Sequence, residues 1–275
     1  MFFKTFKMQM EVMARKKTVV FTLFVIYIFV LVNFWYNMME YKNIGFVSQM
    51  QDPIKMLTLS SWSVSGYFMM QFYPILLAIP TATAYFEDKE TKMKVYVESK
   101  TGKKAYWYSK ALSVFVITFL VFTIPFLIEI FMEVCCFYMN ADGDPTGFAY
   151  IQTIESDSQH LFSSLFLKNK IFYAIVMTLL FGLVTSILAL FNFSVTVLPF
   201  VKYKIFAFLP VYVMLYVITL IQQMTSVEYT LNYFFILRMF DMEAKNYMVY
   251  FSFLLLLLTA SLFIIHVKIK KDDLL

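Results

Sequence analysis

The longest charged run of the chain reads EDKETKMKVYVESKTGKKAYWYSK, from Glu87 to Lys110. It holds seven lysines and four acidic residues between two long apolar segments. A charged side chain at the centre of a bilayer costs about 2.5–3.5 kcal/mol. The run is therefore expected to be a water-facing loop, while the segments that flank it are expected to lie in lipid.

The flanking segments are two of six apolar runs of membrane-spanning length. Crossing about 30 Å of hydrocarbon takes about 20 helical residues. The chain of 275 residues is 61% hydrophobic and 15% charged, whereas soluble domains carry about 25% charged residues. The sequence predicts an all-α integral membrane protein with a single six-span domain over residues 18–275. Its spans are Thr18–Met38, Tyr67–Phe86, Ala111–Val134, Ile171–Phe191, Ile205–Gln222 and Tyr247–Val267.

The distribution of Lys and Arg predicts the orientation of these spans. When alternate connections are assigned to opposite sides, 17 of the 23 basic residues fall on the side of both termini and six fall on the other side. Connections on the cytoplasmic side carry an excess of Lys and Arg. Both termini and the charged run 87–110 are therefore predicted to be cytoplasmic.

Residues 1–17 precede the first span and predict an amphipathic helix that lies on the membrane surface. Phe2, Phe6, Met10 and Met13 recur at steps of three and four residues, which places them on one helical face. Basic residues occupy the remaining surface, as in helices of the headgroup region. A frayed basic tail is the alternative. The span that follows is too long to be the core of a cleavable signal peptide.

The connection 223–246, between the fifth and sixth spans, contains the apolar and aromatic portion Tyr229–Phe240. This portion is too short to cross a membrane. It predicts a re-entrant or interfacial segment on the outer side. An ordinary amphipathic surface helix is the alternative.

Several polar residues and prolines lie inside the predicted spans. Glu129 and Glu133 are four residues apart on the third span and so share a helical face. Carboxylates inside a membrane often line a pathway or relay protons, which makes this pair a possible pathway site. Hydration at the outer membrane interface is the alternative. Asn33 is expected to form hydrogen bonds between helices, and Pro80 is expected to bend or open the second span.

No catalytic pattern is evident in the sequence. It lacks a phosphate-binding loop, an H-E-x-x-H zinc motif and a serine–histidine nucleophile in a strained turn. The adjacent cysteines 135 and 136 and two distant histidines are too few for a zinc site. The basic residues lie beside spans, which is not the pattern of a nucleic-acid-binding surface. We expect no catalytic, metal or cofactor site, no nucleic-acid partner, and a separate source of energy for any work.

Taken together, the chain resembles the permease subunit of an ABC-2 type transporter. The shared layout is six spans with both ends inside, a basic amino-terminal helix, a charged inner loop and an apolar outer segment. The specific part is the loop, which reads Tyr85-Phe86-Glu87-Asp88-Lys89-Glu90-Thr91, then Val95-Tyr96-Val97, then Tyr106 and Lys110. Two positions depart from the family pattern. Lys92 stands where a glycine commonly follows Glu-Thr, and the proline usual near position 101 is absent.

The resemblance implies a partner and a mechanism. Two permease subunits, identical or related, would form a pore bound to two cytoplasmic ABC ATPase subunits, which bind ATP and Mg²⁺ that this chain does not bind itself. The amino-terminal helix and the inner loop would contact the ATPase, while Tyr106, Trp107 and Tyr108 are interpreted as residues of the interfacial aromatic belt. The implied ATPase-coupling residues are Glu87, Asp88, Lys89, Glu90, Val95, Tyr96, Val97 and Glu98.

The expected function is export across a bacterial plasma membrane without an enzymatic site on this chain. The expected substrate is amphipathic, such as a small peptide toxin, a bacteriocin or a hydrophobic drug. Two alternatives remain: a permease for lipid or polysaccharide export, and a membrane scaffold or sensor that binds a cytoplasmic partner without transporting anything.

Overall fold

The computed structural model describes residues 2–43, 50–60, 63–138, 161–199, 201, 203–225, 240 and 247–273. Within these ranges the chain is helical and contains no strand. The helices are α1 (Phe2–Ala14), α2 (Lys17–Tyr41), α3 (Pro53–Met56), α4 (Val64–Ala78), α5 (Ala84–Glu90), α6 (Met93–Thr101), α7 (Lys103–Cys136), α9 (Ser163–Lys168), α10 (Lys170–Thr196), the 3₁₀ helix η2 (Lys204–Phe208), α11 (Leu209–Thr225) and α13 (Tyr247–Asp273).

Five segments are long and apolar enough to cross a membrane. They are α2, α7, α10, the segment Lys204–Ile221 that joins η2 to most of α11, and α13 up to Lys271. Their mean hydropathy lies between 2.1 and 2.6. The prediction of an all-helical, multi-pass membrane protein is therefore confirmed in its coarse form. The predicted outer segment Tyr229–Phe240 lies outside the described residues, apart from its last position.

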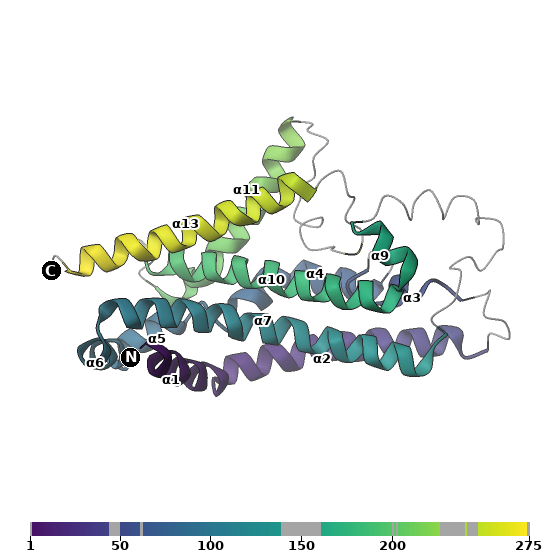
Figure 1. Ribbon diagram of the computed structural model, residues 1–275, viewed down its shortest axis with the longest axis horizontal. Coiled ribbons are helices and arrows are strands. Elements are labelled where there is room, and N and C mark those ends of the chain that lie inside the picture. Colours follow the sequence, from purple (N-terminus) through teal and green to yellow (C-terminus); the bar gives the residue numbers. More distant parts are fainter. Residues whose placement is uncertain are drawn as a thin grey trace.

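The long helices run along one axis (Figure 1). Helices α2, α7 and α10 lie side by side, α13 packs on α10, and α11 inclines away from them. Helix α1, helices α5 and α6 and the carboxyl end of α13 lie at one end of the bundle, which we call the terminal end. Helices α3 and α9 lie at the opposite end, which we call the distal end.

Helices α7 and α10 form the centre of the bundle because their backbones approach closely. A Cβ atom on Gly182 of α10 would lie 2.0 Å from the Thr123 Oγ1 atom of α7, so only glycine fits at this crossing. The buried rings of Phe122, Phe126 and Phe181 pack around it at centroid distances of 5.5–6.4 Å. Aromatic packing of this kind supplies much of the apolar contact in a core.

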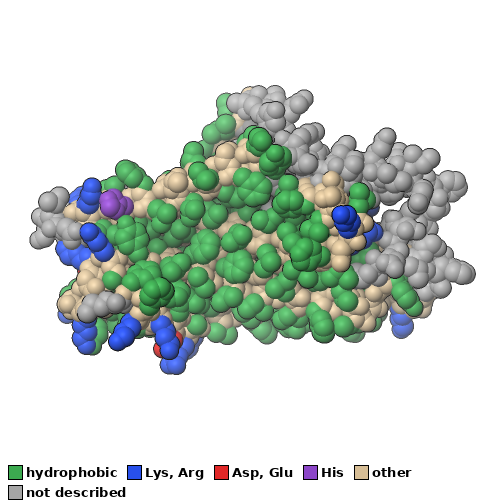
Figure 2. All heavy atoms as spheres, in the orientation of Figure 1, with side chains coloured by type: hydrophobic (Ala, Val, Ile, Leu, Met, Phe, Trp, Pro, Cys, Tyr) green, Lys and Arg blue, Asp and Glu red, His purple; other side chains and the backbone are tan. Residues whose placement is uncertain are grey.

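The outer surfaces of the peripheral helices are apolar. On α2, Ile26 and Val30 are buried against the bundle, whereas Phe24 and Val32 are more than half exposed. Figure 2 shows hydrophobic side chains over the middle of one face and basic side chains mainly toward its two ends. A continuous apolar band of this size is typical of a surface that contacts lipid.

The second predicted span, Tyr67–Phe86, is interrupted, which confirms the expectation that Pro80 bends or opens it. Helix α4 ends at Ala78 after 15 residues, and α5 begins at Ala84 after a turn. Pro80 lies in that turn, where it has no N–H for the helical hydrogen-bond ladder and its ring obstructs the preceding turn of helix. Pro74, in contrast, is accommodated inside α4, and Pro125 inside α7.

The charged run also differs from a simple loop. Its first four residues complete α5, its centre forms α6, and Lys103 to Lys110 form the first turns of α7. The water-facing loop predicted over residues 87–110 is therefore mostly helical. Only the short connections Thr91–Lys92 and Gly102 lie between these helices.

Candidate functional site

Helices α5 and α6 form a short helical hairpin at the terminal end of the bundle. Lys92 joins them with φ = 56°, and Gly102 joins α6 to α7 with φ = 88°. Both angles lie in the left-handed region, which costs glycine little and other residues more. Lys92 therefore adopts a backbone conformation that a glycine would adopt at lower cost.

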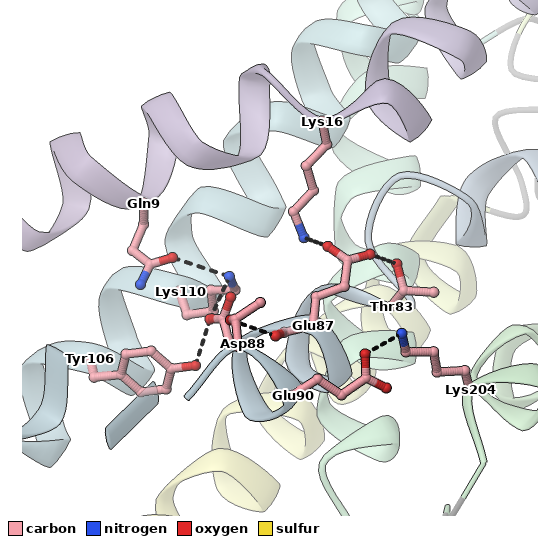
Figure 3. A network of polar contacts seen from close by, with 10 residues as sticks. Gln9, Lys16, Thr83, Glu87, Asp88, Glu90, Tyr106, Lys110 and Lys204 are labelled. Atoms are coloured by element: carbon pink, nitrogen blue, oxygen red, sulfur yellow. Dashed lines mark hydrogen bonds and ion pairs between the residues drawn. The ribbon is translucent and has the colours of Figure 1, made fainter. Parts of the chain in front are cut away.

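The first buried contact of this hairpin joins α5 to α7. The Nζ atom of Lys110 lies 2.8 Å from the Oδ2 atom of Asp88, and the Tyr106 hydroxyl donates a 2.7 Å hydrogen bond to the same oxygen (Figure 3). The Lys110 side chain is 0% exposed and that of Asp88 is 6% exposed. A buried ion pair needs such additional hydrogen bonds to offset the loss of hydration.

Lys110 also connects α7 to the amino-terminal helix. Its Nζ atom donates a 3.1 Å hydrogen bond to the Oε1 atom of Gln9, which is buried on α1 (Figure 3). One ammonium group therefore links three segments that are far apart in sequence. We call Gln9, Asp88, Tyr106 and Lys110 the terminal cluster.

A second ion pair ties the start of α2 to α5. Lys16 Nζ lies 2.6 Å from Glu87 Oε2, and the Thr83 hydroxyl donates a 2.6 Å hydrogen bond to Glu87 Oε1 (Figure 3). Burial by itself would raise the pKa of the Glu87 carboxyl. The hydrogen bonds from Lys16 and Thr83 outweigh this effect, so that the pKa lies below the ordinary value of 4.5.

The two faces of α6 have different environments. Val97 is buried against the bundle, and Lys94 lies with its Nζ atom 5.1 Å from the centre of the Trp107 ring of α7. The opposite face consists of Val95, Tyr96, Ser99 and Lys100, all exposed, and we call it the α6 outer face. Exposed residues recur at steps of three and four, as expected for a helix that packs on one side only.

The eight predicted coupling residues therefore do not form one surface. Lys89, Glu90, Val95 and Tyr96 are exposed, whereas Asp88 and Val97 are buried and hold the hairpin to the bundle. Glu87 and Glu98 are partly exposed, and both are in ion pairs, with Lys16 and Lys94 respectively. The exposed Glu90 pairs with Lys204 at 2.6 Å (Figure 3).

The amino-terminal residues 2–14 are helical as predicted, but the packed face is different. Thr5, Gln9 and Met13 are buried along one line of α1, which packs on α7. Met13 is 0% exposed and so contacts protein instead of lipid. Phe2, Phe6 and Met10 are half-buried. A helix whose face contains a buried amide is positioned by a polar partner, which here is Lys110.

The interpretation of Tyr106 and Trp107 as residues of the interfacial aromatic belt is also wrong. Both side chains are 0% exposed, so they are core residues and not members of an interfacial aromatic belt. Trp107 packs against Tyr85 with ring centroids 5.6 Å apart. Tyr108 is partly exposed, and its hydroxyl lies 3.2 Å from the Nδ1 atom of His266 on α13.

Glu129 lies at the distal end of α7 and is 1% exposed. Its Oε1 atom accepts hydrogen bonds from the Asn33 side chain (2.9 Å), the Thr58 backbone N–H (2.8 Å) and the Thr58 hydroxyl (2.6 Å). The Ser63 hydroxyl donates to the Asn33 Oδ1 atom at 2.7 Å. The predicted role of Asn33 in bonding helices together is confirmed.

Glu133 lies one turn further along α7, and it is also 1% exposed. The Asn37 side chain donates a 3.0 Å hydrogen bond to its Oε1 atom and a 2.9 Å hydrogen bond to the backbone oxygen of Met56. Both glutamates are buried, which does not agree with the alternative of hydration at the outer membrane interface. Their role along a substrate pathway stays a prediction. We call Asn33, Asn37, Thr58, Glu129 and Glu133 the distal cluster.

Both clusters contain residues that the sequence analysis did not single out. In the terminal cluster, Gln9 was not expected to take part, and Lys110 was not expected to pair with Asp88. For the distal cluster one signal was present in the sequence. Asn33 and Asn37 share the four-residue spacing of Glu129 and Glu133, and each Asn–Glu pair is separated by 96 positions. Two polar pairs of equal spacing on two apolar helices indicate a paired contact.

No protein-family model, curated protein or solved structure matches the chain. Across the described ranges, no group of three or more His, Cys, Asp or Glu side chains is arranged to hold a metal ion.

Proposed function

We propose that this chain is the membrane-spanning permease subunit of an ATP-driven exporter of the ABC-2 type. A separate cytoplasmic ATPase, in two copies, would bind at the α5–α6 hairpin and supply the energy. The observation that carries this proposal is an exposed apolar pair, Val95 and Tyr96, on α6, a short charged helix whose hairpin neighbour α5 is held to α7 by the buried contacts of Asp88.

The α6 outer face has the composition of a protein-binding surface. Val95 is 67% exposed and Tyr96 is 54% exposed, although both lie outside the long apolar helices. Lys100 lies next to the Tyr96 hydroxyl and ring. Aromatic residues are enriched at the centres of interfaces, and a polar and charged rim commonly surrounds them. This supports a protein partner for the face rather than contact with water alone.

The terminal cluster supports the transmission of force from the α6 outer face to α7. Displacing α6 and α5 relative to α7 would separate Asp88 from Lys110 and leave both charges buried without a counter-ion. Such a separation is costly, since breaking a buried pair costs about 3–5 kcal/mol. The lower-energy response is for α5, α1 and α7 to move together. A force applied at α6 would then reach the long axis of α7, which extends to the distal end.

The membrane arrangement follows from the same proposal. The segment 64–86, comprising α4, the turn at Pro80 and the first residues of α5, would make the sixth crossing, and the terminal end with its excess of lysines would face the cytoplasm of a bacterium. A second permease subunit, identical or related, would complete the pore. The proposed substrate is amphipathic, such as a small peptide toxin, a bacteriocin or a hydrophobic drug. Lipid or polysaccharide export is the alternative within transport.

Co-purification and ATP hydrolysis test this proposal together. The tagged chain is isolated in mild detergent from its native membrane, and a bound ATPase is identified by mass spectrometry and assayed after reconstitution in lipid vesicles. We expect the wild-type chain to recover an ATPase whose turnover depends on the chain. The double substitution Val95→Asp and Tyr96→Asp should lower recovery by about tenfold or more, the effect of losing a central interface contact.

Tyr138→Asp provides the matched control, because Tyr138 is 68% exposed and lies just after α7 at the distal end. It should leave ATPase recovery unchanged. Equal recovery with the wild-type chain and with the double variant would overturn the assignment of the α6 outer face. Recovery of an ATPase whose turnover is independent of the chain would favour the scaffold alternative over transport.

A further inference from the structure

The two carboxyl groups of the distal cluster have unequal partners. One oxygen of Glu129 accepts three hydrogen bonds, which is the environment that stabilises a carboxylate anion. Glu133 accepts one hydrogen bond, from Asn37, at Oε1. Its Oε2 atom is buried and receives no hydrogen bond from any residue that the structure describes. A buried oxygen without a donor is unusual and calls for a ligand.

Glu133 lines a small pocket between α3, α7 and α10. Its volume is about 10 Å³, which is the space that one water molecule needs. The wall contains Ile54, Leu57, Ile130 and Ile171, which have no polar side-chain atoms. A metal ion would need several oxygen ligands here, and only Glu133 supplies a carboxylate. A proton needs a single oxygen and no additional space.

Among the residues that the structure describes, no charged group forms an ion pair with Glu133. Lys170 of α10 lines the same pocket, but its Nζ atom is paired with the Asp52 carboxylate. The neighbouring Tyr41 of α2 and Glu129 of α7 carry no positive charge, and Lys55 of α3 does not line the pocket. Two anions one turn apart in an apolar contact, with no cation between them, would repel each other and lose hydration.

We propose that Glu133 is a proton-binding site at the distal end, and that it is a neutral carboxylic acid in this conformation. The proton sits on Oε2 and points into the pocket, while Oε1 accepts the hydrogen bond of Asn37. Release of the proton to water leaves a carboxylate at the contact of α3, α7 and α10. That charge is compensated only if Lys170 leaves Asp52 or if Glu133 leaves the contact. Proton binding therefore keeps α3, α7 and α10 in contact around Glu133. This inference does not depend on the proposed transport function.

Infrared difference spectroscopy of the purified chain in lipid nanodiscs tests the proposal directly. At neutral pH the wild-type spectrum should contain the carbonyl band of a protonated carboxylic acid, which shifts in D₂O. Glu133→Gln should remove this band, and Glu40→Gln, at an exposed position of α2, should retain it. If Glu133→Gln does not fold, Glu133→Asp replaces it and should shift the band instead of removing it.

Two results would overturn the assignment. Loss of the band in Glu129→Gln with retention in Glu133→Gln would place the proton on the other glutamate. The second result is that the wild-type chain lacks the band and unfolds at a higher temperature in sodium chloride than in choline chloride. If Glu133→Gln abolishes this difference in unfolding temperature, sodium is the ligand. If Glu133 is neutral, Glu133→Gln should unfold at a temperature close to that of the wild-type chain, because glutamine imitates the protonated acid.

Discussion

Helix α7 buries charged groups at both of its ends, and the two ends compensate them differently. At the terminal end, Lys110 is paired with Asp88, and the charges cancel across two helices. At the distal end, Glu129 and Glu133 have amide and hydroxyl partners, and no cation among the described residues pairs with them. The terminal cluster is therefore locked by charge complementarity, whereas the distal cluster depends on neutral donors and on its protonation state.

This difference has a mechanical consequence for a protein that changes conformation. An ion pair in an apolar environment resists separation, since each partner loses its counter-ion while it stays buried. A set of hydrogen bonds to a carboxyl group can be exchanged stepwise, and its strength changes when a proton binds. The rigid connection, the terminal cluster, therefore lies at the end that carries the α6 outer face. The adjustable contact, the distal cluster, lies at the opposite end.

The largest effect is expected from breaking the terminal cluster. Lys110→Met removes the cation and leaves Asp88 buried, which should lower the free energy of unfolding by about 3–5 kcal/mol. Denaturant or thermal unfolding in detergent measures this loss. Lys104→Met, at an exposed position of the same helix, is the control. Adding Asp88→Leu to Lys110→Met should recover most of the loss, and a double variant as unstable as the single one would contradict a locking ion pair.

A smaller effect is expected from the distal cluster. Glu129→Gln keeps the shape of the side chain but replaces an acceptor of three hydrogen bonds by an amide, and it should cost about 1–3 kcal/mol. The same unfolding measurement applies, with Glu40→Gln as the exposed control. Stability equal to the wild-type value would show that these hydrogen bonds do not hold α2, α3 and α7 together.

The ion pair of Glu87 predicts a dependence of stability on acid pH. The pKa of Glu87 in the folded chain lies below its ordinary value of 4.5, because Lys16 and Thr83 stabilise the anion. The contribution is therefore present above pH 4.5 and is lost as the pH falls through the lower folded value. Glu87→Gln should flatten the loss of stability in this acid range, whereas Glu11→Gln, at an exposed position of α1, should not.

The smallest effect is expected where the charges are open to water. Lys204 and Glu90 form a 2.6 Å pair whose side chains are 43% and 60% exposed. Pairs of this kind contribute about 0–1 kcal/mol. Lys204→Ala should therefore change the unfolding free energy far less than Lys110→Met. A loss as large as that of Lys110→Met would remove the distinction between the buried and the exposed ion pairs of the terminal end.

Much of the helix layout follows from local properties of the sequence. Hydropathy locates α2, α7, α10 and α13 to within a few residues, apart from the eight residues by which α7 begins before Ala111. The break in the second span also follows from the sequence, because Pro80 interrupts the helix in apolar surroundings. The length of α7 was missed because charged and aromatic residues next to a span also form helix when they have protein to pack against.

The sequence by itself determined that this chain is a helical membrane protein, which segments are apolar enough to cross, and where charge must leave the lipid. These properties depend on runs of neighbouring residues. The tertiary structure alone decided which polar residues meet. Gln9 and Lys110 lie 101 positions apart, and Asn33 and Glu129 lie 96 positions apart. Their pairing arises from the way the helices cross, because a buried polar atom must find its partner on whichever helix packs beside it.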